Sequence, residues 1–337
     1  MAGCELPLTA TQLRSLRRAL LRWYDAHRRE LPWRRDRDPY RVWVSEIMLQ
    51  QTRVAAVLDH YGRFLRRFAN VESLARAREA SVLAMWSGLG YYHRARRMHR
   101  TAKIIVRERQ GKFPRTAREW LDLPGIGRYT AAAILSIAFD EPVAVVDGNV
   151  ERVLQRLIGG EHNRWEQAQT LLDRKRPGDF NQAIMELGAT ICTPRAPQCR
   201  LCPVISFCET RGAGRATVTA ARKRKELRYA LARRNDAVLL VRRPASASLM
   251  AGMWELPALG AEQTDGYPPL LRLRHSITDT AYRVAVFAID AKPLQAPNAK
   301  WFTWAQCLRL PMTGLARKIL RRAALVDNPR QPSGITA

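Results

Sequence analysis

The sequence predicts a multidomain protein with two folded parts, a largely helical first part that contains four clustered cysteines and a smaller second part with an α+β fold. The chain has 337 residues, which exceeds the usual size of a single domain. Helical periodicity near the N-terminus contrasts with short strand-like runs after residue 229. The cysteines lie at 192–208, in a Pro-rich stretch that cannot form one face of a helix.

Positive charge dominates the composition. Lys and Arg number 57 and Asp and Glu 30, so the net charge is +27. Such a field attracts polyanions, and we expect nucleic acid as the partner; a generally Arg-rich composition is the alternative. The first ten residues do not resemble a signal peptide, and no apolar run is long enough to cross a bilayer. We therefore expect a cytoplasmic, nucleoid-associated protein that is monomeric and has no membrane partner.

Composition shifts set the expected boundaries. The second part is expected after a stretch rich in Arg, Lys, Ala and Gly, and a Pro-containing tail follows it. The expected segments are a disordered N-terminus at 1–10, a helical domain at 11–208, a basic linker at 209–228, the second domain at 229–326 and a disordered tail at 327–337.

The first expected helix covers residues 11–27 and is followed by a break. Residues 11–27 place Leu13, Leu16 and Leu20 on one stripe, which predicts an amphipathic helix with a basic outer face. Residues 28–34 end it.

Glu46 is the unusual residue of the next helix, which is expected to start at Pro39 and to continue through residues 50–52. Its neighbours one turn away include Val42 and Trp43. Apolar surroundings penalise the carboxylate and raise the pKa, which suits a general acid near neutrality. A buried Glu paired with an Arg is the alternative.

Residues 93–100 begin a basic helix, and a helix–turn–helix is expected at 123–128. Gly125 and Gly127 leave backbone N–H groups uncovered at the start of the second helix, while Ile126 plugs the turn into the core. Such a turn can bind a phosphate without reading base sequence. A Pro-Gly turn between helices is common, so the glycines alone are weak evidence.

Asp147 follows an apolar segment and stands at a predicted helix start. A simple N-cap is the alternative reading, but capping and catalysis are compatible. Donors at the helix start can hold the carboxylate ionised where positive charge develops on a sugar.

The cysteine spacing indicates a metal centre. Structural zinc normally uses two close Cys-x-x-Cys pairs, whereas this segment has one. The uneven outer spacings favour an iron–sulfur cluster with four corner ligands, with zinc and disulfides as alternatives. The ligands would be Cys192, Cys199, Cys202 and Cys208, and Cys4 and Cys307 would be bystanders.

The second part shows strand-like runs followed by a helix near 313–325. The runs lie at 237–241, 253–257, 282–289 and 300–304. No acidic Gly-x5-Glu-x7-Arg-Glu-x-x-Glu-Glu box is present, so this part lacks the ligands for magnesium-dependent pyrophosphate hydrolysis.

Several motifs together resemble the helix-hairpin-helix DNA glycosylases of the endonuclease III superfamily. These are the cysteine spacing, Leu-Pro-Gly-Ile-Gly-Arg-Tyr-Thr-Ala at 123–131 and Val-Asp-Gly-Asn-Val at 146–150. Ser-Glu-Ile-Met-Leu-Gln-Gln-Thr at 45–52 and Gly-Leu-Gly-Tyr-Tyr at 88–92 narrow the resemblance to the adenine DNA glycosylases. The likeness covers about residues 12–310.

The resemblance implies an all-α helix-hairpin-helix glycosylase domain with an iron–sulfur loop and a [4Fe-4S] cluster, followed by an α+β Nudix-like domain. It implies base excision repair of double-stranded DNA, in which adenine mispaired with 8-oxoguanine or guanine is flipped out and removed by hydrolysis. Glu46 would protonate N7 of adenine and Asp147 would stabilise the oxocarbenium-like sugar, with Tyr129 and Asn149 beside them.

The resemblance also implies contacts with adenine, with the opposite strand and with the DNA backbone. The base-contacting residues would be Arg29, Trp33, Leu49, Gln51, Leu89, Tyr91, Gln182 and Thr278, and the backbone-binding residues Gly125, Gly127 and Arg128. An inserted Leu89 must stand clear of the backbone; the alternative places Leu89 and its tyrosine neighbours in the core, and Trp33 as a loop anchor. The family's Phe-Ser-His reading loop is replaced here by Ile277-Thr278-Asp279.

Two other functions stay open at this level. A bifunctional glycosylase–lyase places a Schiff-base lysine where Tyr129 stands, and a phenol cannot form an imine. A non-catalytic iron–sulfur DNA-binding protein would need neither Glu46 nor Asp147.

Overall fold

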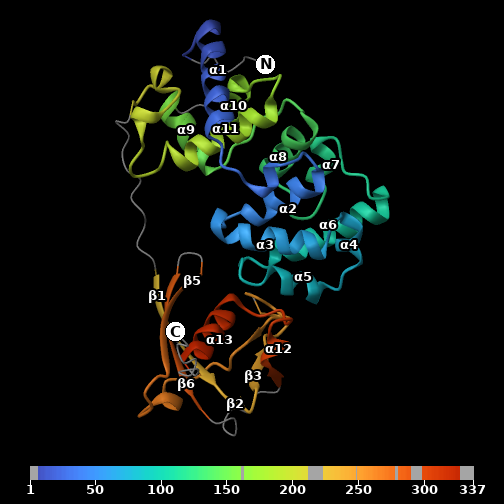
Figure 1. Ribbon diagram of the computed structural model, residues 1–337, viewed down its shortest axis with the longest axis vertical. Coiled ribbons are helices and arrows are strands. Elements are labelled where there is room, and N and C mark those ends of the chain that lie inside the picture. Colours follow the sequence, from blue (N-terminus) through green and yellow to red (C-terminus); the bar gives the residue numbers. More distant parts are fainter. Residues whose placement is uncertain are drawn as a thin grey trace, which may run out of the picture. The chain divides into compact units, whose positions relative to one another are not determined.

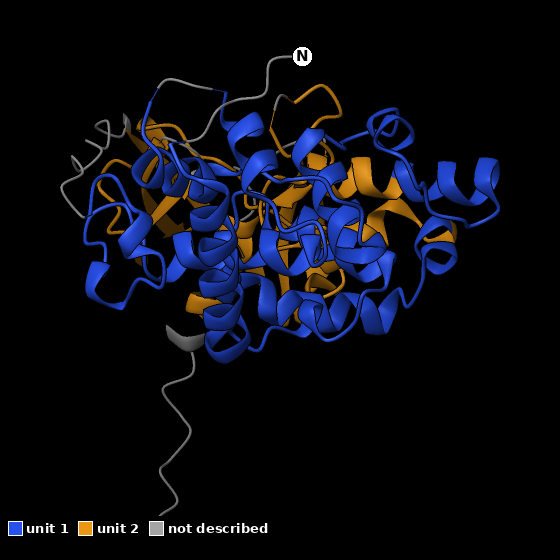
Figure 2. Cartoon of the chain, turned by 90° about the horizontal axis from the view of Figure 1, so that it is seen from above, with its two compact units in different colours: residues 1–75, 100–219 blue, residues 76–99, 220–337 orange. Residues whose placement is uncertain are grey.

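The structure, a computed structural model, describes residues 7–160, 163–211, 223–247, 249–277, 280–289 and 298–326 (Figure 1). The chain forms two compact units, Met1–Ala75 with Arg100–Thr219 and Arg76–His99 with Ala220–Ala337 (Figure 2). The second unit therefore includes residues 76–99, which the sequence placed inside the helical domain. Sequence periodicity shows that a segment is helical but not which core it joins.

The first unit is helical in its described residues. Helix α6, His93–Arg109, begins within the second unit and ends within the first. The remaining helices are α1 Ala10–His27, α2 Pro39–Leu49, α3 Val54–Arg67, α4 Val71–Arg76, α7 Ala117–Leu121, α8 Arg128–Phe139, α9 Gly148–Leu157, α10 Arg164–Leu171 and α11 Pro177–Thr190, with short 3-10 turns η1 Pro32–Arg34, η2 Cys199–Leu201 and η3 Ile205–Phe207.

Local signals fix the starts of α1 and α2. The Thr9 side chain accepts from the Gln12 backbone N–H, and the Gln12 side chain reaches back, which forms a capping box before α1. Asp38 caps α2 ahead of Pro39, whose fixed φ suits the first helical position. The helix expected at 11–27 and the one expected from Pro39 are both confirmed.

The expectation that α2 continues through residues 50–52 is wrong. The helix ends at Leu49, and Gln51 has φ of 52°, in the left-handed region that a right-handed helix cannot contain. The Gln50 side chain donates to Thr130 Oγ1 at 3.1 Å, which ties the turn to α8. The three residues after α2 therefore form a strained turn rather than a last helical turn.

Helix α8 lies in the middle of the first unit and packs against α2, α7 and α11. Buried Asn181 of α11 donates to Ser136 Oγ at 2.9 Å and to the Val143 carbonyl at 2.8 Å, and it accepts from the Val145 N–H. Side chains thus satisfy the backbone of the extended segment at 143–146, since it pairs with no strand of the described residues. This segment leads directly to Asp147.

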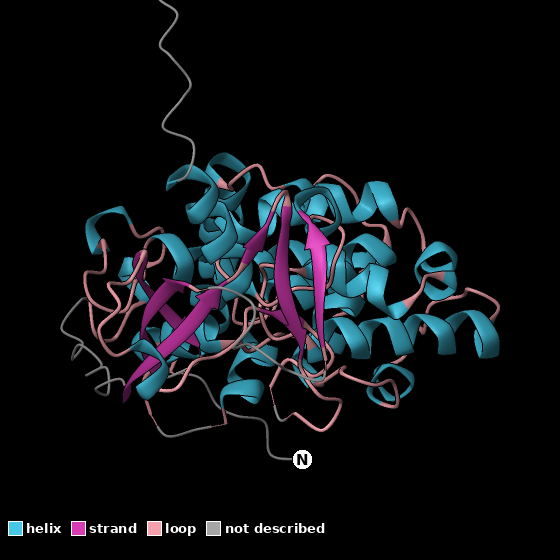
Figure 3. Ribbon diagram, turned by 90° about the horizontal axis from the view of Figure 1, so that it is seen from below, coloured by secondary structure: helices cyan, strands magenta, loops and turns pink. Residues whose placement is uncertain are grey.

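The second unit contains two sheets, helix α5 Glu79–Trp86 and the last helices of the chain. The strands, magenta in Figure 3, form a sheet of order β1-β6-β5, with β1 parallel and β5 antiparallel to β6, and a sheet of order β2-β3-β4, with β7 also paired to β3. Their bounds are β1 Lys223–Leu231, β2 Arg233–Arg234, β3 Ala237–Arg242, β4 Trp254–Glu255, β5 Leu271–Ile277, β6 Thr280–Ala288 and β7 Ala299–Thr303, with η4 Glu262–Thr264, α12 Trp304–Cys307 and α13 Gly314–Val326.

Helix α13 covers the core of this unit, where Leu315 and Ile319 pack with strand residues such as Val238 and Val286. The four strand-like runs and the final helix are confirmed as β3, β4, β6, β7 and α13. Strand β1 starts at Lys223, inside the segment 209–228 that was expected to be a linker. Its polar sequence gives no strand signal, and pairing with β6 supplies its hydrogen bonds instead.

The described residues contain no helix that is long and apolar enough to cross a membrane. Of the two expected disordered ends, residues 1–6 and 327–337 lie outside the described residues, and α1 begins at Ala10.

Helices α9 and α11 approach closely because residue 188 is glycine. A methyl group there would lie 2.8 Å from Asn149 Cβ, whereas one at Gly148 would meet nothing within 4 Å. We expect Gly188→Ala to lower the free energy of unfolding by about 1–3 kcal/mol, the usual cost of overpacking. Denaturant unfolding checks this, with Gly148→Ala as the control; equal stabilities of the two variants would contradict the close approach.

Candidate active site

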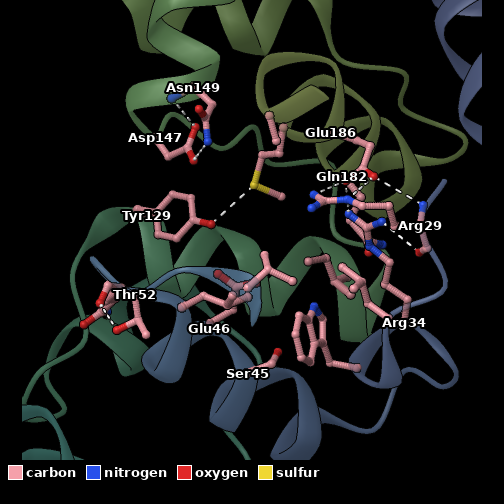
Figure 4. A pocket seen from close by; sticks show the side chains of 18 of the residues that line it. Arg29, Arg34, Ser45, Glu46, Thr52, Tyr129, Asp147, Asn149, Gln182 and Glu186 are labelled. Carbon is pink, nitrogen blue, oxygen red and sulfur yellow. Dashed lines mark hydrogen bonds and ion pairs between the residues drawn. The ribbon is translucent and has the colours of Figure 1, made fainter. Parts of the chain in front are cut away.

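A cavity of about 690 Å³ lies in the first unit, between α2, η1, α8, the start of α9 and α11 (Figure 4). It brings together most of the residues that the sequence singled out for chemistry and base binding. These are Arg29, Trp33, Glu46, Leu49, Gln51, Tyr129, Asp147, Asn149 and Gln182.

Glu46 faces this cavity from the buried side of α2. The residue is 6% exposed, and its Oε2 has no hydrogen-bond partner in the described part of the chain. Burial raises the pKa of the carboxyl to about 7; the Tyr129 hydroxyl and Arg34 lower it, and the charge of Asp147 raises it. The pKa of Glu46 is therefore raised by burial, as its apolar neighbours in the sequence predicted.

Asp147 is the N-cap of α9. Its Oδ1 accepts from the backbone N–H groups of Asn149 at 2.9 Å and Val150 at 2.7 Å, and its Oδ2 accepts from Asn149 Nδ2 at 3.2 Å. The carboxylate is half-buried and reaches the cavity. Three donors at a helix start thus orient the carboxylate.

Arg152, one turn into α9, connects this carboxylate to the cysteine loop. Its Nη2 donates to Asn149 Oδ1 and to the Gly188 carbonyl, both at 2.8 Å, and its Nε donates to the Cys192 carbonyl at 2.9 Å. Asn149 in turn holds Asp147. The sequence reasoning missed Arg152, although it lies three residues after Asn149 on the same helix.

Tyr129 lies in the cavity wall near both acids. Its hydroxyl donates to Met185 Sδ at 3.3 Å. Burial raises the pKa of this phenol well above its usual value, and the charges of Glu46 and Asp147 raise it further. The phenol therefore stays protonated and can donate a hydrogen bond.

A second buried carboxylate in the wall was also missed. Glu186 is 1% exposed and forms ion pairs with Arg29 at 2.6 Å and Arg34 at 2.8 Å. Burial by itself would raise its pKa, but the hydrogen bonds from both arginines outweigh burial and lower the pKa to about 2. A usable signal existed, because Glu186 lies four residues after Gln182 and so shares its face of α11.

Trp33 and Gln182 complete the wall on this side. Trp33 is 7% exposed, and its ring meets Tyr61 edge-on at 5.3 Å between centroids. Gln182 lies half-buried on α11. Trp33 thus anchors its loop to the core and lines the cavity, so the two readings of this residue are compatible.

The predicted hairpin is present between α7 and α8. Gly125 has φ of 84°, Ile126 is buried, and no side chain in the described residues caps the amides that follow Gly127. Thr101 Oγ1 donates to the Pro124 carbonyl and holds the turn. Exposed Arg128 places its guanidinium 4.0 Å from the centroid of the Trp165 ring.

The four cysteines of the loop are free and half-buried. Burial raises the pKa of the Cys202 thiol to about 11, and the other three thiols are close enough to add to this shift. No three His, Cys, Asp or Glu side chains of the described residues converge as ligands of a single metal ion.

Three predicted base-contacting residues are not among the described residues of the first unit. Leu89 and Tyr91 belong to the second unit, and Thr278 lies outside the described residues. Leu89 does not stand clear of the backbone as expected, because it is 5% exposed. Tyr91 has φ of 47°, a strained conformation for a residue other than glycine.

Residues 44–177 match the HhH-GPD superfamily of base excision DNA repair proteins. The adenine DNA glycosylase of Mus musculus is 37% identical in an alignment of 399 positions, gaps included, which covers 91% of this chain and 77% of that protein.

Two solved structures resemble part of the chain. A thermostable thymine-DNA glycosylase gives a TM-score of 0.57 at 30% identity over 60% of this chain and 98% of its own. A trapped covalent intermediate of endonuclease III with DNA gives a TM-score of 0.53 at 22% identity, over 60% of this chain and 97% of its own, which shows a shared fold. Because the mouse relative is matched over most of both chains, the protein belongs to the adenine DNA glycosylase family.

Proposed function

We propose that this protein is a monofunctional DNA glycosylase of base excision repair, which hydrolyses the N-glycosidic bond of adenine mispaired with 8-oxoguanine or guanine. The observation that carries the proposal is one cavity that holds a buried, readily protonated acid, Glu46, and a carboxylate fixed at a helix start, Asp147. Family membership supports adenine as the base.

The proposed reaction uses these two acids in different protonation states. Glu46 donates its proton to N7 of the flipped adenine, which makes the base a better leaving group. As the bond to C1′ breaks, its electrons pass to the base, and Asp147 stabilises the positive charge on the sugar. Water then adds to C1′ and loses a proton. Tyr129 offers a hydroxyl but no amine, so the sugar forms no imine with this position.

Base binding is proposed for Trp33 and Gln182, which also line the cavity. Trp33 offers an apolar ring face, and the Gln182 amide can both donate to and accept from the adenine edge. The Glu186 ion pairs keep Arg29 and Arg34 in place beside them. We assign Arg29 to base binding through this fixed position.

DNA binding is proposed to rest on the net charge of +27 and on the uncapped amides of the hairpin. Gln51 lies on the strained turn after α2, is exposed and lines the cavity, which suits a side chain that enters the duplex beside the flipped base.

Cys192, Cys199, Cys202 and Cys208 are proposed to hold a [4Fe-4S] cluster. Such a cluster would supply a rigid metal-linked loop rather than a proton donor. Through the Cys192 carbonyl and Arg152, this loop supports Asn149 and hence Asp147.

A labelled duplex with adenine opposite 8-oxoguanine tests the function directly. Under enzyme excess and subsequent hot alkali, we expect strand cleavage at the adenine, because base loss leaves an alkali-labile site. Lack of that site would favour the non-catalytic DNA-binding protein, and a covalent adduct trapped by borohydride would favour the glycosylase–lyase.

The raised pKa of Glu46 sets the expected pH dependence. The acid works when protonated, so kcat/KM should be level below about pH 7 and fall about tenfold for each unit above it. Glu46→Gln should lower the rate by roughly 10²–10⁴, while Glu141→Gln, an exposed control, should behave as the wild type. A level profile up to pH 9 would contradict this role.

Arg152 and Arg156 offer a matched pair for testing support of Asp147. Both contact the cysteine loop, but only Arg152 also bonds to Asn149. We expect Arg152→Gln to slow single-turnover excision roughly ten- to hundredfold, as misplaced catalytic groups do, with iron content retained. Arg156→Gln should leave this rate close to that of the wild type. Equal rates for the two variants would show that the bond to Asn149 has no catalytic consequence.

Thr278 is proposed to contact the base opposite adenine. Its hydroxyl can donate to or accept from the oxidised base edge, so Thr278→Ala should reduce the preference for 8-oxoguanine over guanine by about 1 kcal/mol, the net worth of one hydrogen bond. Single-turnover rates on both duplexes measure this preference. An unchanged ratio would place recognition elsewhere.

A further inference from the structure

One backbone carbonyl in the second unit holds both ends of the turn between α5 and α6. The Met312 carbonyl accepts from Ser87 Oγ at 2.7 Å and from the Tyr92 hydroxyl at 3.1 Å. The Gly88 N–H donates to the same Tyr92 hydroxyl at 3.4 Å. Ser87 and Tyr92 are 8% and 3% exposed, so these bonds form away from solvent.

The Met312 carbonyl belongs to a segment that is fixed by strand β4. Trp254 donates its N–H to the Pro311 carbonyl at 2.9 Å, and its own carbonyl accepts from the Thr313 N–H at 3.0 Å. The Trp254 ring packs edge-on against Phe302 at 4.7 Å between centroids. The turn is therefore attached to the core formed by the C-terminal strands.

Helix α13 extends this attachment toward strand β5. Arg317 donates through Nε to Ser87 Oγ and through Nη2 to the Leu310 carbonyl. The next residue, Lys318, donates through Nζ to the Arg274 carbonyl of β5 at 2.7 Å. Arg317 and Lys318, which are adjacent on α13, thus bond to the turn and to β5, respectively. Residues 278–279 follow β5 in the sequence.

The middle of the turn has a backbone that needs such support. Tyr91 has φ of 47°, and Gly88 and Gly90 also have positive φ. A residue other than glycine holds this conformation only where its surroundings impose it. Leu89, between the glycines, is buried, so any entry into DNA requires it to move while the ends of the turn stay fixed.

We propose that Ser87 and Arg317 are positioning residues, which make the conformation of the turn at 88–91 depend on the C-terminal strands. Helix α13 bonds to both β5 and the turn. When β5 lies against the base opposite adenine, α13 therefore favours the arrangement of the turn in which Tyr91 and Leu89 contact the duplex. This inference rests on the proposed function, and it assigns to these two residues a part in preferring 8-oxoguanine over guanine.

Single-turnover excision by Ser87→Ala and Arg317→Met tests the inference on duplexes with adenine opposite 8-oxoguanine and opposite guanine. We expect the ratio of the two rates to fall about fivefold in each variant, the effect of one net hydrogen bond. Because the two residues bond to each other, the double variant should lose less than the product of the single losses. Arg317→Lys should regain part of the ratio, and exposed Arg321→Met is the control for charge on α13.

The outcomes below distinguish a failure of this inference from a failure of the proposed function. If the wild type removes adenine and prefers 8-oxoguanine, but both variants keep its ratio, the inference is overturned. It is also overturned if the two rates fall by one common factor alongside a lower unfolding temperature, since that would be a stability effect. Should Ser87→Ala fail to fold, Arg317→Met decides, because it leaves the bond from Ser87 to Met312 in place. A wild type without adenine excision would overturn the proposed function itself.

Discussion

The site depends on keeping one carboxylic acid buried without an ion pair strong enough to hold it ionised. Two buried glutamates line the same cavity and illustrate the difference. Glu46 lacks a hydrogen-bond partner for Oε2 in the described residues, and its pKa is raised to about 7. Glu186 binds two arginines, and its pKa is lowered to about 2. Partners rather than burial decide which acid can release and regain a proton near neutrality.

The second acid of the proposed mechanism is held by the architecture of the first unit. Asn181 attaches the segment at 143–146 to α8 and α11, and the start of α9 then supplies the donors to Asp147. Arg152 extends the support to the cysteine loop. A loop whose own residues take no part in proton transfer can therefore affect the chemistry.

Local sequence signals predicted much of the site. Apolar neighbours marked Glu46, an apolar segment before a helix start marked Asp147, and the glycines at 125 and 127 marked the hairpin. Spacing places Glu186 on the helix face of Gln182 and Arg152 near Asn149. It does not show that Glu186 pairs with Arg29 and Arg34, or that Arg152 bonds to Cys192, because these partners are far apart in the sequence. The end of α2 at Leu49 and the start of β1 at Lys223 depend on contacts with α8 and β6. Leu89 is a further example. It was expected to stand clear of the backbone, but it is buried by tertiary contacts that the sequence does not show.

The central claim is that Glu46 is protonated in the free enzyme near neutrality. Infrared difference titration of the wild type against Glu46→Gln observes this carboxyl without relying on turnover. We expect a protonated carboxyl band that persists at about pH 6 and disappears with a midpoint near 7. A carboxyl that is already fully ionised at about pH 5, close to the behaviour of an ordinary glutamate, would contradict the account.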